Sequence, residues 1–301
     1  MHVHRTSPVV TVFAPAKLNL FLEVLGKRTD GFHEIETLMV PVSLCDTLAF
    51  QSGSDSAISC DCHWHYPRTA QGSTRPPAQL GDNNLAVRAA RRLREAAGIA
   101  AGATMQLVKR VPMEAGLAGG SSDAAAALIA GNVAWNLNWP VERLAEVAAE
   151  LGSDVPFFLS GRPAVCTGRG EHVTPQRDLA PLHFVIVQPP AGLSTAEVYR
   201  QCRPAAQPHT AQPLIDAWRA GRAAAVGQLI HNRLEAAADG ISPWIARLRE
   251  EFNKLDFLGH QMTGSGSAYF GICRHARHAR RLAAALRSRG FAQVFAVAGP
   301  N

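Results

Sequence analysis

The sequence is short of cysteine, of aromatic residues and of long apolar runs. Of its 301 residues 47% are hydrophobic, but only 7% are aromatic and six are cysteines. No segment approaches the roughly 18 consecutive apolar residues of a membrane helix, and residues 1–8 lack the apolar run of a signal peptide. Scattered cysteines in a chain of this length predict reduced thiols rather than a disulfide framework. We therefore expect a cytoplasmic protein without a membrane partner.

Acidic residues are also fewer than basic residues. The 30 Lys and Arg outnumber the 24 Asp and Glu, which gives a formal net charge of +6. A positive balance suits an anionic substrate. Part of it lies between Arg274 and Arg281, a run typical of the solvated face of a helix, with nucleic-acid contact as the alternative.

The chain is long enough for one large core or two domains, and we expect two, residues 1–176 and 177–301. A Pro-Pro-Ala-Gly break at residues 189–192 supports a change of domain in this part of the chain. Residues 67–81 are expected to be an exposed excursion without chemistry. Strands are predicted at 12–24, 34–44, 47–51, 59–66, 104–110, 184–188 and 293–298, and helices at 84–97, 122–135, 141–151, 213–220, 223–238, 242–252 and 275–289. This order indicates an α+β fold rather than alternating βαβ units.

The strand predicted at residues 12–24 carries polar side chains on one face. Strand periodicity places Lys17 and Asn19 together with Glu23 on that face, opposite Leu18 and Leu20. The pattern indicates a strand with a polar working face.

A glycine-rich turn at residues 111–125 leads directly into an alanine-rich segment. Gly116, Gly119 and Gly120 allow a bulky anion to approach the backbone, and Ser121 and Ser122 add hydroxyl donors. Free N–H groups at the start of a helix favour phosphate. A flexible turn before a helix is the alternative, since the loop matches neither common phosphate-binding glycine signature.

Four possible zinc ligands lie close together, namely Cys60, Cys62, His63 and His65. Their spacing is not that of paired zinc knuckles. Strand alternation would place the cysteines on one face and the histidines on the other, so no metal site is predicted.

Several motifs together resemble those of the GHMP kinases, the galactose, homoserine, mevalonate and phosphomevalonate kinases. The resemblance extends from about residue 12 to 297. Its motifs are Ala-Pro-Ala-Lys-Leu-Asn-Leu at 14–20, Asp-Gly-Phe-His at 30–33, the loop at 112–125, Gly-Ser-Asp-Val-Pro-Phe at 152–157, Gly-Arg-Gly-Glu at 168–171 and Thr-Gly-Ser-Gly-Ser at 263–267. It implies an N-terminal ATP-binding domain like ribosomal protein S5 and a C-terminal ferredoxin-like domain. The first two motifs are similar to those of members whose alcohol substrate carries a cytidine diphosphate group.

The resemblance implies transfer of phosphate from ATP to the 2-hydroxyl of that alcohol, a step in isoprenoid precursor biosynthesis. Asp154 would be the base, with capping of the next helix as its alternative role. Lys17 would stabilise charge beside it, with an ordinary surface lysine as the alternative. Mg²⁺ should accompany ATP, held largely by phosphates and water. The residues expected to bind ATP are Pro112, Gly116, Leu117, Ala118, Gly119, Gly120, Ser121 and Ser122.

The resemblance also implies a pocket for the cytidine diphosphate end. His33 would bond the cytosine edge, and Phe32 replaces a usual tyrosine, so it retains a ring for stacking without the hydroxyl. Thr195 and Tyr199 match the spacing of a threonine and a second ring, although Ala196 stands where proline is common. Asn19 is expected to hydrogen-bond substrate.

Two further motifs are not assigned a chemical role. The second glycine turn at 263–267 lies near the phosphates in the family, but a tight turn between strands explains it equally well. Residues 232–235, Asn-Arg-Leu-Glu, resemble the family without suggesting a chemical role.

Two alternatives to this function remain at the sequence level. The same scaffold could act on homoserine or on a mevalonate-type alcohol, in which case His33 and the stacking rings would have no use. An RNA-binding protein would show salt-dependent binding without turnover, but no stripe of alternating aromatic and basic residues supports it. We expect a small-molecule partner, no nucleic acid, and a monomer or homodimer.

Overall fold

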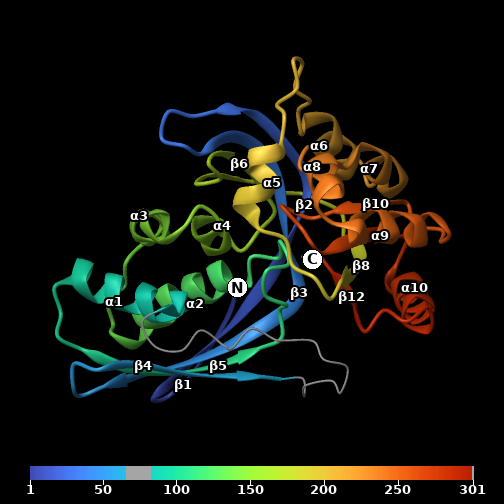
Figure 1. The fold of residues 1–301 in the computed structure, drawn as a ribbon. Coiled ribbons are helices and arrows are strands. Elements are labelled where there is room, and N and C mark those ends of the chain that lie inside the picture. Colours follow the sequence, from blue (N-terminus) through green and yellow to red (C-terminus); the bar gives the residue numbers. More distant parts are fainter. Residues whose placement is uncertain (66–82, 300–301) are drawn as a thin grey trace. The chain divides into compact units, whose positions relative to one another are not determined.

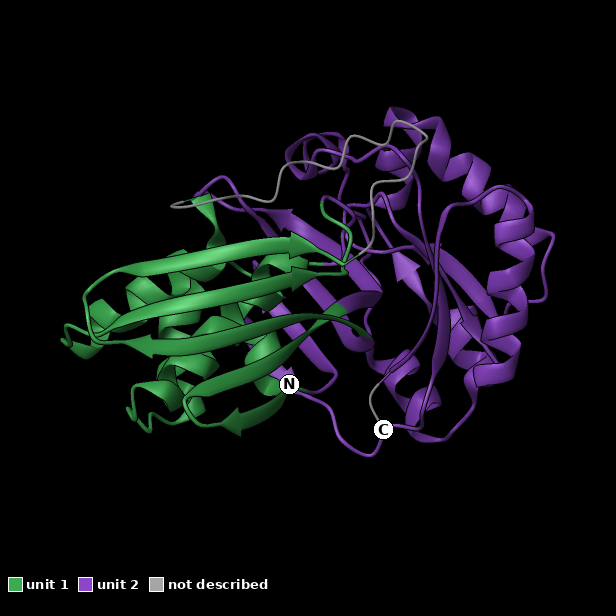
Figure 2. Cartoon of the chain, turned by 90° about the horizontal axis from the view of Figure 1, so that it is seen from below, with its two compact units in different colours: residues 1–16, 44–113, 118–161 green, residues 17–43, 114–117, 162–301 purple. Residues whose placement is uncertain are grey.

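The computed structural model describes residues 1–65 and 83–299 (Figure 1), and it mixes helices and strands as predicted. Its contacts divide the chain into two compact units (Figure 2). The N-terminal unit contains residues 1–16, 44–113 and 118–161, and the C-terminal unit contains residues 17–43, 114–117 and 162–301. Two long strands, β2 (Val9–Lys27) and β3 (His33–Gly53), run from one unit into the other. The domain boundary after residue 176 stays a prediction.

The N-terminal unit is built on a sheet with helices on one side (Figure 1). Strand β1 (His2–Thr6) is antiparallel to the start of β2, and β5 (Gly102–Lys109) is antiparallel to the end of β3. Strand β4 (Ile58–Trp64) is parallel to β5. The helices are α1 (Leu85–Ala97), α2 (Gly119–Ala134), α3 (Val141–Leu151) and α4 (Val155–Ser160).

The two ends and the buried face of helix α1 follow from residues within and next to it. The Asn84 side chain accepts a hydrogen bond from the Ala86 N–H, and Gly98 ends the helix in the left-handed conformation with φ 62°. Ala86, Ala89 and Leu93 are buried at helical spacing. The predicted helix at 84–97 is therefore confirmed nearly to the residue.

The C-terminal unit contains a four-stranded sheet in the order β10 (Gly259–Met262), β11 (Tyr269–Cys273), β8 (His183–Gln188) and β12 (Gln293–Ala298). Helices α9 (Pro243–Asn253) and α10 (Ala276–Ser288) contact this sheet. Strand β6 (Ala164–Gly168) pairs with β3 and with β7 (His172–Pro175). The remaining elements are α5 (Thr195–Gln201), α6 (Gln212–Arg219), α7 (Ala223–Leu229), β9 (His231–Asn232) and α8 (Glu235–Ile241).

Three predicted elements need correction. The single helix expected at 223–238 is broken, because the chain becomes extended at Ile230 (φ −61°, ψ 144°) and β9 pairs in parallel with Phe21 and Leu22 of β2. The helix expected at 122–135 begins three residues earlier, at Gly119. The strands expected at 34–44 and 47–51 form one continuous strand, β3. The excursion predicted at residues 67–81 lies outside the described residues.

The basic run near residue 274 lies on and before α10. Arg274 and Arg281 both pair with Asp256, at 2.9 and 2.7 Å. The helix buries its apolar side and exposes its arginines, so the expectation of a solvated helical face is confirmed. No helix within the described ranges is both long and apolar enough to span a bilayer.

Candidate functional site

The first glycine turn has an unusual backbone. Glu114, Gly116 and Ala118 have positive φ values of 53°, 72° and 54°. At Gly116 an added Cβ would lie 2.3 Å from the Thr263 carbonyl oxygen, so a side chain cannot be accommodated there. The Ala268 N–H also donates to the Ala115 carbonyl at 3.1 Å. The two glycine turns predicted from the sequence therefore lie directly against each other.

Helix α2 begins immediately after this turn, with Ala118 at its N-cap. The Ser122 N–H makes a helical hydrogen bond to the Ala118 carbonyl at 3.0 Å, so the N–H groups of residues 119–121 precede the helical ladder. An added Cβ on Gly120 would meet no atom within 4 Å. This open helix start can receive an anion, because backbone N–H groups and the helix dipole both favour negative charge there.

The other residues predicted to bind ATP are less accessible. Pro112 and Leu117 are buried, Ser121 is partly buried, and Ser122 is completely buried. The Ser122 hydroxyl has no hydrogen-bond partner among the described residues. Gly120 is therefore the exposed point of the helix start.

Lys17 is buried in β2, with 4% of its surface exposed. Its Nζ donates to the Asn19 Oδ1 at 2.5 Å and to the Gly116 carbonyl at 2.8 Å. The lysine predicted from strand alternation thus contacts the first glycine turn directly. An ordinary surface lysine, the alternative weighed from the sequence, does not fit this burial.

Asn19 has its carboxamide engaged on both sides. Its Nδ2 donates to the Thr37 hydroxyl at 2.8 Å, and its Oδ1 accepts from Lys17 and, at 3.2 Å, from the Thr263 hydroxyl. The Asn19 N–H donates to the same Thr263 oxygen at 3.0 Å. Its substrate contact stays a prediction, whereas its contact with Lys17 orients the ammonium group.

Asp154 precedes α4 and follows the Gly152 cap of α3. Within the described helix α4, the Asp154 side chain makes no capping hydrogen bond, which removes support from the capping alternative. It lies in the N-terminal unit, whereas Lys17 lies in the C-terminal unit. That the two side chains converge on one alcohol stays a prediction.

His33 and Tyr199, which are far apart in the sequence, form a ring pair in the C-terminal unit. Their centroids are 5.1 Å apart with an interplanar angle of 33°. Burial, helped by nearby Lys27, lowers the pKa of His33 below its ordinary value. Phe32 is 51% exposed, with the Arg169 guanidinium 4.9 Å from its ring centre. The structure therefore brings His33 and Tyr199 together and leaves the Phe32 ring available for stacking.

Thr195 is the first residue of α5, after the Ser194 cap. Its hydroxyl lies 2.8 Å from the Ser265 hydroxyl of the second glycine turn. The helix that carries Tyr199 is thereby joined to the turn that contacts Lys17.

A buried ionic cluster in the N-terminal unit was not predicted. Lys109 donates to carboxylates of Asp46 and, at 2.5 Å, Asp123. Asp46 also accepts hydrogen bonds from the N–H groups of Arg110 and Val111. Lys109 shares the inward face of β5 with the buried Met105 and Leu107, so strand alternation could have signalled a buried lysine.

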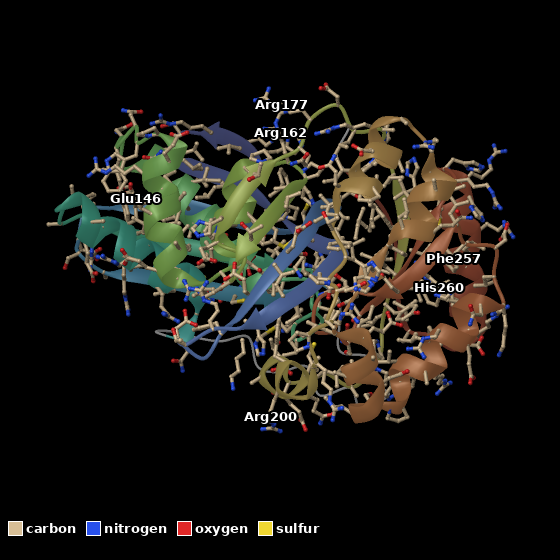
Figure 3. The ribbon with its side chains drawn as sticks, turned by 90° about the horizontal axis from the view of Figure 1, so that it is seen from above. Glu146, Arg162, Arg177, Arg200, Phe257 and His260 are labelled. Atoms are coloured by element: carbon tan, nitrogen blue, oxygen red, sulfur yellow. The ribbon has the colours of Figure 1, made fainter. Side chains whose placement is uncertain are left out.

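A pocket of about 880 Å³ lies within the C-terminal unit, but it contains none of the predicted site residues. Arg249 lines it and bridges Glu235 and Asp239, at 3.0 and 2.7 Å. Phe257 and His260, labelled in Figure 3, also line it. This pocket is thus separate from the predicted site residues, although Asn232 and Glu235 of the unassigned sequence motif line it.

The possible zinc ligands on β4 and at His65, just after it, are arranged as alternation predicts. Cys60 and Cys62 are partly buried, whereas His63 and His65 are exposed. Across the described residues there is no group of three or more His, Cys, Asp or Glu that could hold a metal ion.

Two family models match the chain. The GHMP kinases N terminal domain matches residues 84–162, and the GHMP kinases C terminal domain matches residues 214–292.

Curated relatives match along nearly the whole chain. A 4-diphosphocytidyl-2-C-methyl-D-erythritol kinase of Pelotomaculum thermopropionicum is 42% identical over 281 residues, which is 93% of this chain and 94% of the relative. The kinase of the same name from Shouchella clausii is 38% identical over 290 residues, with 95% and 93% covered.

Solved structures agree with these matches. A crystal structure of 4-(cytidine 5'-diphospho)-2C-methyl-D-erythritol kinase has a TM-score of 0.78 and 36% identity, covering 97% of this chain and 100% of that chain. A homoserine kinase from Cytophaga hutchinsonii has a TM-score of 0.69 at 16% identity, with 100% and 97% covered. That second likeness concerns the fold alone.

Proposed function

Because the chain belongs to the GHMP kinase family, we propose that it transfers the γ-phosphate of ATP to the 2-hydroxyl of 4-diphosphocytidyl-2-C-methyl-D-erythritol. The products are the 2-phosphate and ADP. The observation that carries this proposal is the likeness, over nearly the whole chain, to relatives that bear the name of this kinase. The chain is thus an ATP-dependent kinase of a small molecule, and the identity of the alcohol is what the experiment below tests.

The start of α2 is the proposed seat of the ATP phosphates. Gly119, Gly120 and Ser121 offer N–H groups that precede the helical ladder, and the open space at Gly120 admits phosphate oxygens. Mg²⁺ enters with ATP as part of the co-substrate. Phosphate and water oxygens suit this hard cation, which usually keeps several waters.

Phosphoryl transfer to an alcohol requires alignment, removal of the hydroxyl proton and neutralisation of charge. Asp154 accepts the proton as the new bond forms, a contribution of roughly 10²–10⁴-fold in comparable enzymes. Lys17 stabilises the negative charge that spreads over the transferred group. Asn19 holds the ammonium group of Lys17 in place through the hydrogen bond of 2.5 Å.

The cytidine end of the substrate binds at His33, Phe32 and Tyr199. A lowered pKa keeps the His33 imidazole neutral at neutral pH, so one ring nitrogen donates and the other accepts. That pairing suits the cytosine edge, which presents both an amino group and acceptors. The exposed Phe32 ring offers a stacking surface, and Thr195 is the polar contact at the start of α5.

Cellular location, oligomeric state, the absence of a nucleic-acid partner and an alternative acceptor alcohol are further proposals. The enzyme is expected to act in the cytoplasm as a monomer or homodimer, without nucleic acid as a partner. An alcohol such as homoserine or mevalonate is the alternative acceptor, since the homoserine kinase shares the fold.

A coupled assay of ADP release tests the acceptor directly. We expect turnover with 4-diphosphocytidyl-2-C-methyl-D-erythritol and none with homoserine or mevalonate. The His33→Ala variant should raise KM for the cytidylyl alcohol by at least about 10-fold, while KM for ATP changes little. Faster turnover of homoserine or mevalonate, or an equal rise of both KM values in the variant, would overturn the proposal.

A further inference from the structure

We infer that Asn232 is a positioning residue for Lys17, and that it acts by fixing the turn at residues 262–264 against the lysine. The inference rests on the proposed function, in which Lys17 stabilises the transferred phosphate. It assigns a role to the Asn-Arg-Leu-Glu motif at residues 232–235, for which the sequence suggested no role.

The Asn232 side chain clamps two carbonyl groups at once. Its Nδ2 donates to the Met262 carbonyl at 2.8 Å and to the Gly264 carbonyl at 2.9 Å. Its Oδ1 accepts from the Leu234 N–H at 3.0 Å. The residue is 8% exposed, so both amide hydrogens and the oxygen are committed to protein backbone. The clamped carbonyls flank Thr263 on either side.

Thr263 hydrogen-bonds Asn19, the neighbour of Lys17, and Gly264 lies beside the lysine. The Thr263 hydroxyl exchanges hydrogen bonds with the N–H and the Oδ1 of Asn19, at 3.0 and 3.2 Å. An added Cβ on Gly264 would lie 3.1 Å from the Lys17 Nζ. The Gly264 backbone therefore borders the space that the ammonium group occupies, and a shift of the turn changes that space.

Glu235, at the end of the same motif, holds the other side of Met262. Its Oε2 accepts the Met262 N–H at 2.9 Å, and its Oε1 pairs with Arg249 at 3.0 Å. The N–H and the carbonyl of Met262 are thus bonded to two side chains of one motif. The motif is itself tied to β2, because Arg233 pairs with Glu23 at 2.6 Å.

Positioning is the expected role because phosphoryl transfer depends on placement. A misplacement of about 1 Å can cost about 10²-fold in rate. Loss of the Asn232 hydrogen bonds should therefore displace Lys17 and lower kcat. The start of α2, which is proposed to bind ATP, should stay unchanged.

The test compares Asn232→Ala and Asn232→Asp with a matched control. The aspartate keeps the acceptor for Leu234 but turns a carboxylate toward two carbonyl oxygens, so it should release the turn as alanine does. Asn132→Ala is the control, because Asn132 makes a similar backbone clamp on Trp139, with hydrogen bonds of 3.1 and 2.9 Å. It lies near the opposite end of α2, roughly 18 Å along the helix axis from Gly120.

Both Asn232 variants should lower kcat at least about 10-fold with KM for ATP nearly unchanged. Asn132→Ala should lower the melting temperature comparably and leave kcat near that of the parent chain. Unchanged kcat in the two Asn232 variants, or an equal loss in Asn132→Ala, would overturn the inference.

A second readout separates this inference from the proposed function. Amide hydrogen exchange of residues 262–268 should accelerate in Asn232→Ala and stay slow in Asn132→Ala, whichever alcohol the enzyme accepts. An inactive parent chain would refute the proposed acceptor alone. Unchanged exchange at the turn would refute the clamp alone.

Discussion

Lys17 and Lys109 are buried to the same degree, each about 4% exposed, yet their surroundings differ. Lys109 in the N-terminal unit lies between the carboxylates of Asp46 and Asp123. Lys17 in the C-terminal unit donates to a carboxamide oxygen and a backbone carbonyl. Two carboxylates offset the charge of the Lys109 ammonium group, whereas the Asn19 and Gly116 oxygens orient that of Lys17. The comparison indicates that Lys109 stabilises the N-terminal unit, whereas Lys17 lies against the first glycine turn, where we propose that it serves an anionic ligand.

The pKa of Lys109 follows from this surrounding. Burial opposes the charged form, but the two carboxylates outweigh it and raise the pKa above the ordinary value. The cluster also fixes the chain entering the first glycine turn, since Asp46 accepts the N–H groups of Arg110 and Val111. Its contribution to function is therefore expected to pass through the fold.

Replacing Lys17 should have the largest effect on rate. We expect Lys17→Met to lower kcat by about 10²-fold or more, because it removes the positive charge that we propose to stabilise the transferred phosphate. KM for ATP should change little. Steady-state kinetics with saturating alcohol measures both. A variant with parental kcat would show that Lys17 does not stabilise the transferred phosphate.

Asp154→Asn offers a companion test. It should also lower kcat by about 10²-fold or more, because it removes the group that we propose as the base. If the two groups act on one alcohol, the double variant with Lys17→Met should be little slower than the slower single variant. Fully multiplicative losses would indicate that the two side chains act independently.

Lys109→Met should have the largest effect on stability. Removing one partner of a buried ion pair costs about 3–5 kcal/mol, because the remaining charge is left uncompensated. Denaturant unfolding should show a loss of this size, while kcat of the folded enzyme stays within about threefold of the parent. The exposed Lys27 is the matched control, for which methionine should cost less than about 0.5 kcal/mol. Equal losses of unfolding free energy in the Lys109 and Lys27 variants would show that Lys109 has no special role in stability.

How much the sequence reveals differs between these two clusters. Alternation in β2 placed Lys17 and Asn19 on one face, and the structure confirms their common face and adds that it is buried. The same rule applied to β5 would have found Lys109. Its partner Asp46 is 63 residues away along the chain, and no local pattern joins them.

The position of Asn232 could not be predicted from the neighbouring sequence. Apolar and alanine residues around it predict a continuous helix at 223–238, yet backbone pairing with Leu22 interrupts that helix. Helix propensity is a weak preference that tertiary contacts override. The interruption is what directs the Asn232 side chain to the turn at Met262 and Gly264. The resemblance implied a common pocket for His33 and Tyr199, whereas the direct pairing of the two rings is seen only in the structure.

The smallest expected effect concerns the pH dependence of the Lys109 cluster. Burial raises the pKa of Asp123, and nearby Asp46 raises it further, whereas Lys109 opposes the rise. In the unfolded chain an aspartate titrates at about 3.9, so the folded state keeps the proton to higher pH than the unfolded state does. The folded state then binds more protons, and the free energy of unfolding falls as the pH rises above about 4 toward the folded pKa.

Asp123→Asn should remove this slope, because asparagine does not titrate while its oxygen can still accept from Lys109. One pKa unit is worth about 1.4 kcal/mol, and we expect a difference of that order, smaller than the loss in Lys109→Met. Urea unfolding of both proteins between pH 4 and 8 measures it. The parent chain should lose stability relative to the variant as the pH rises. Parallel curves of unfolding free energy against pH would mean that Asp123 has the same pKa in the folded and the unfolded chain. The cluster would then stabilise the fold without making its stability depend on pH through Asp123.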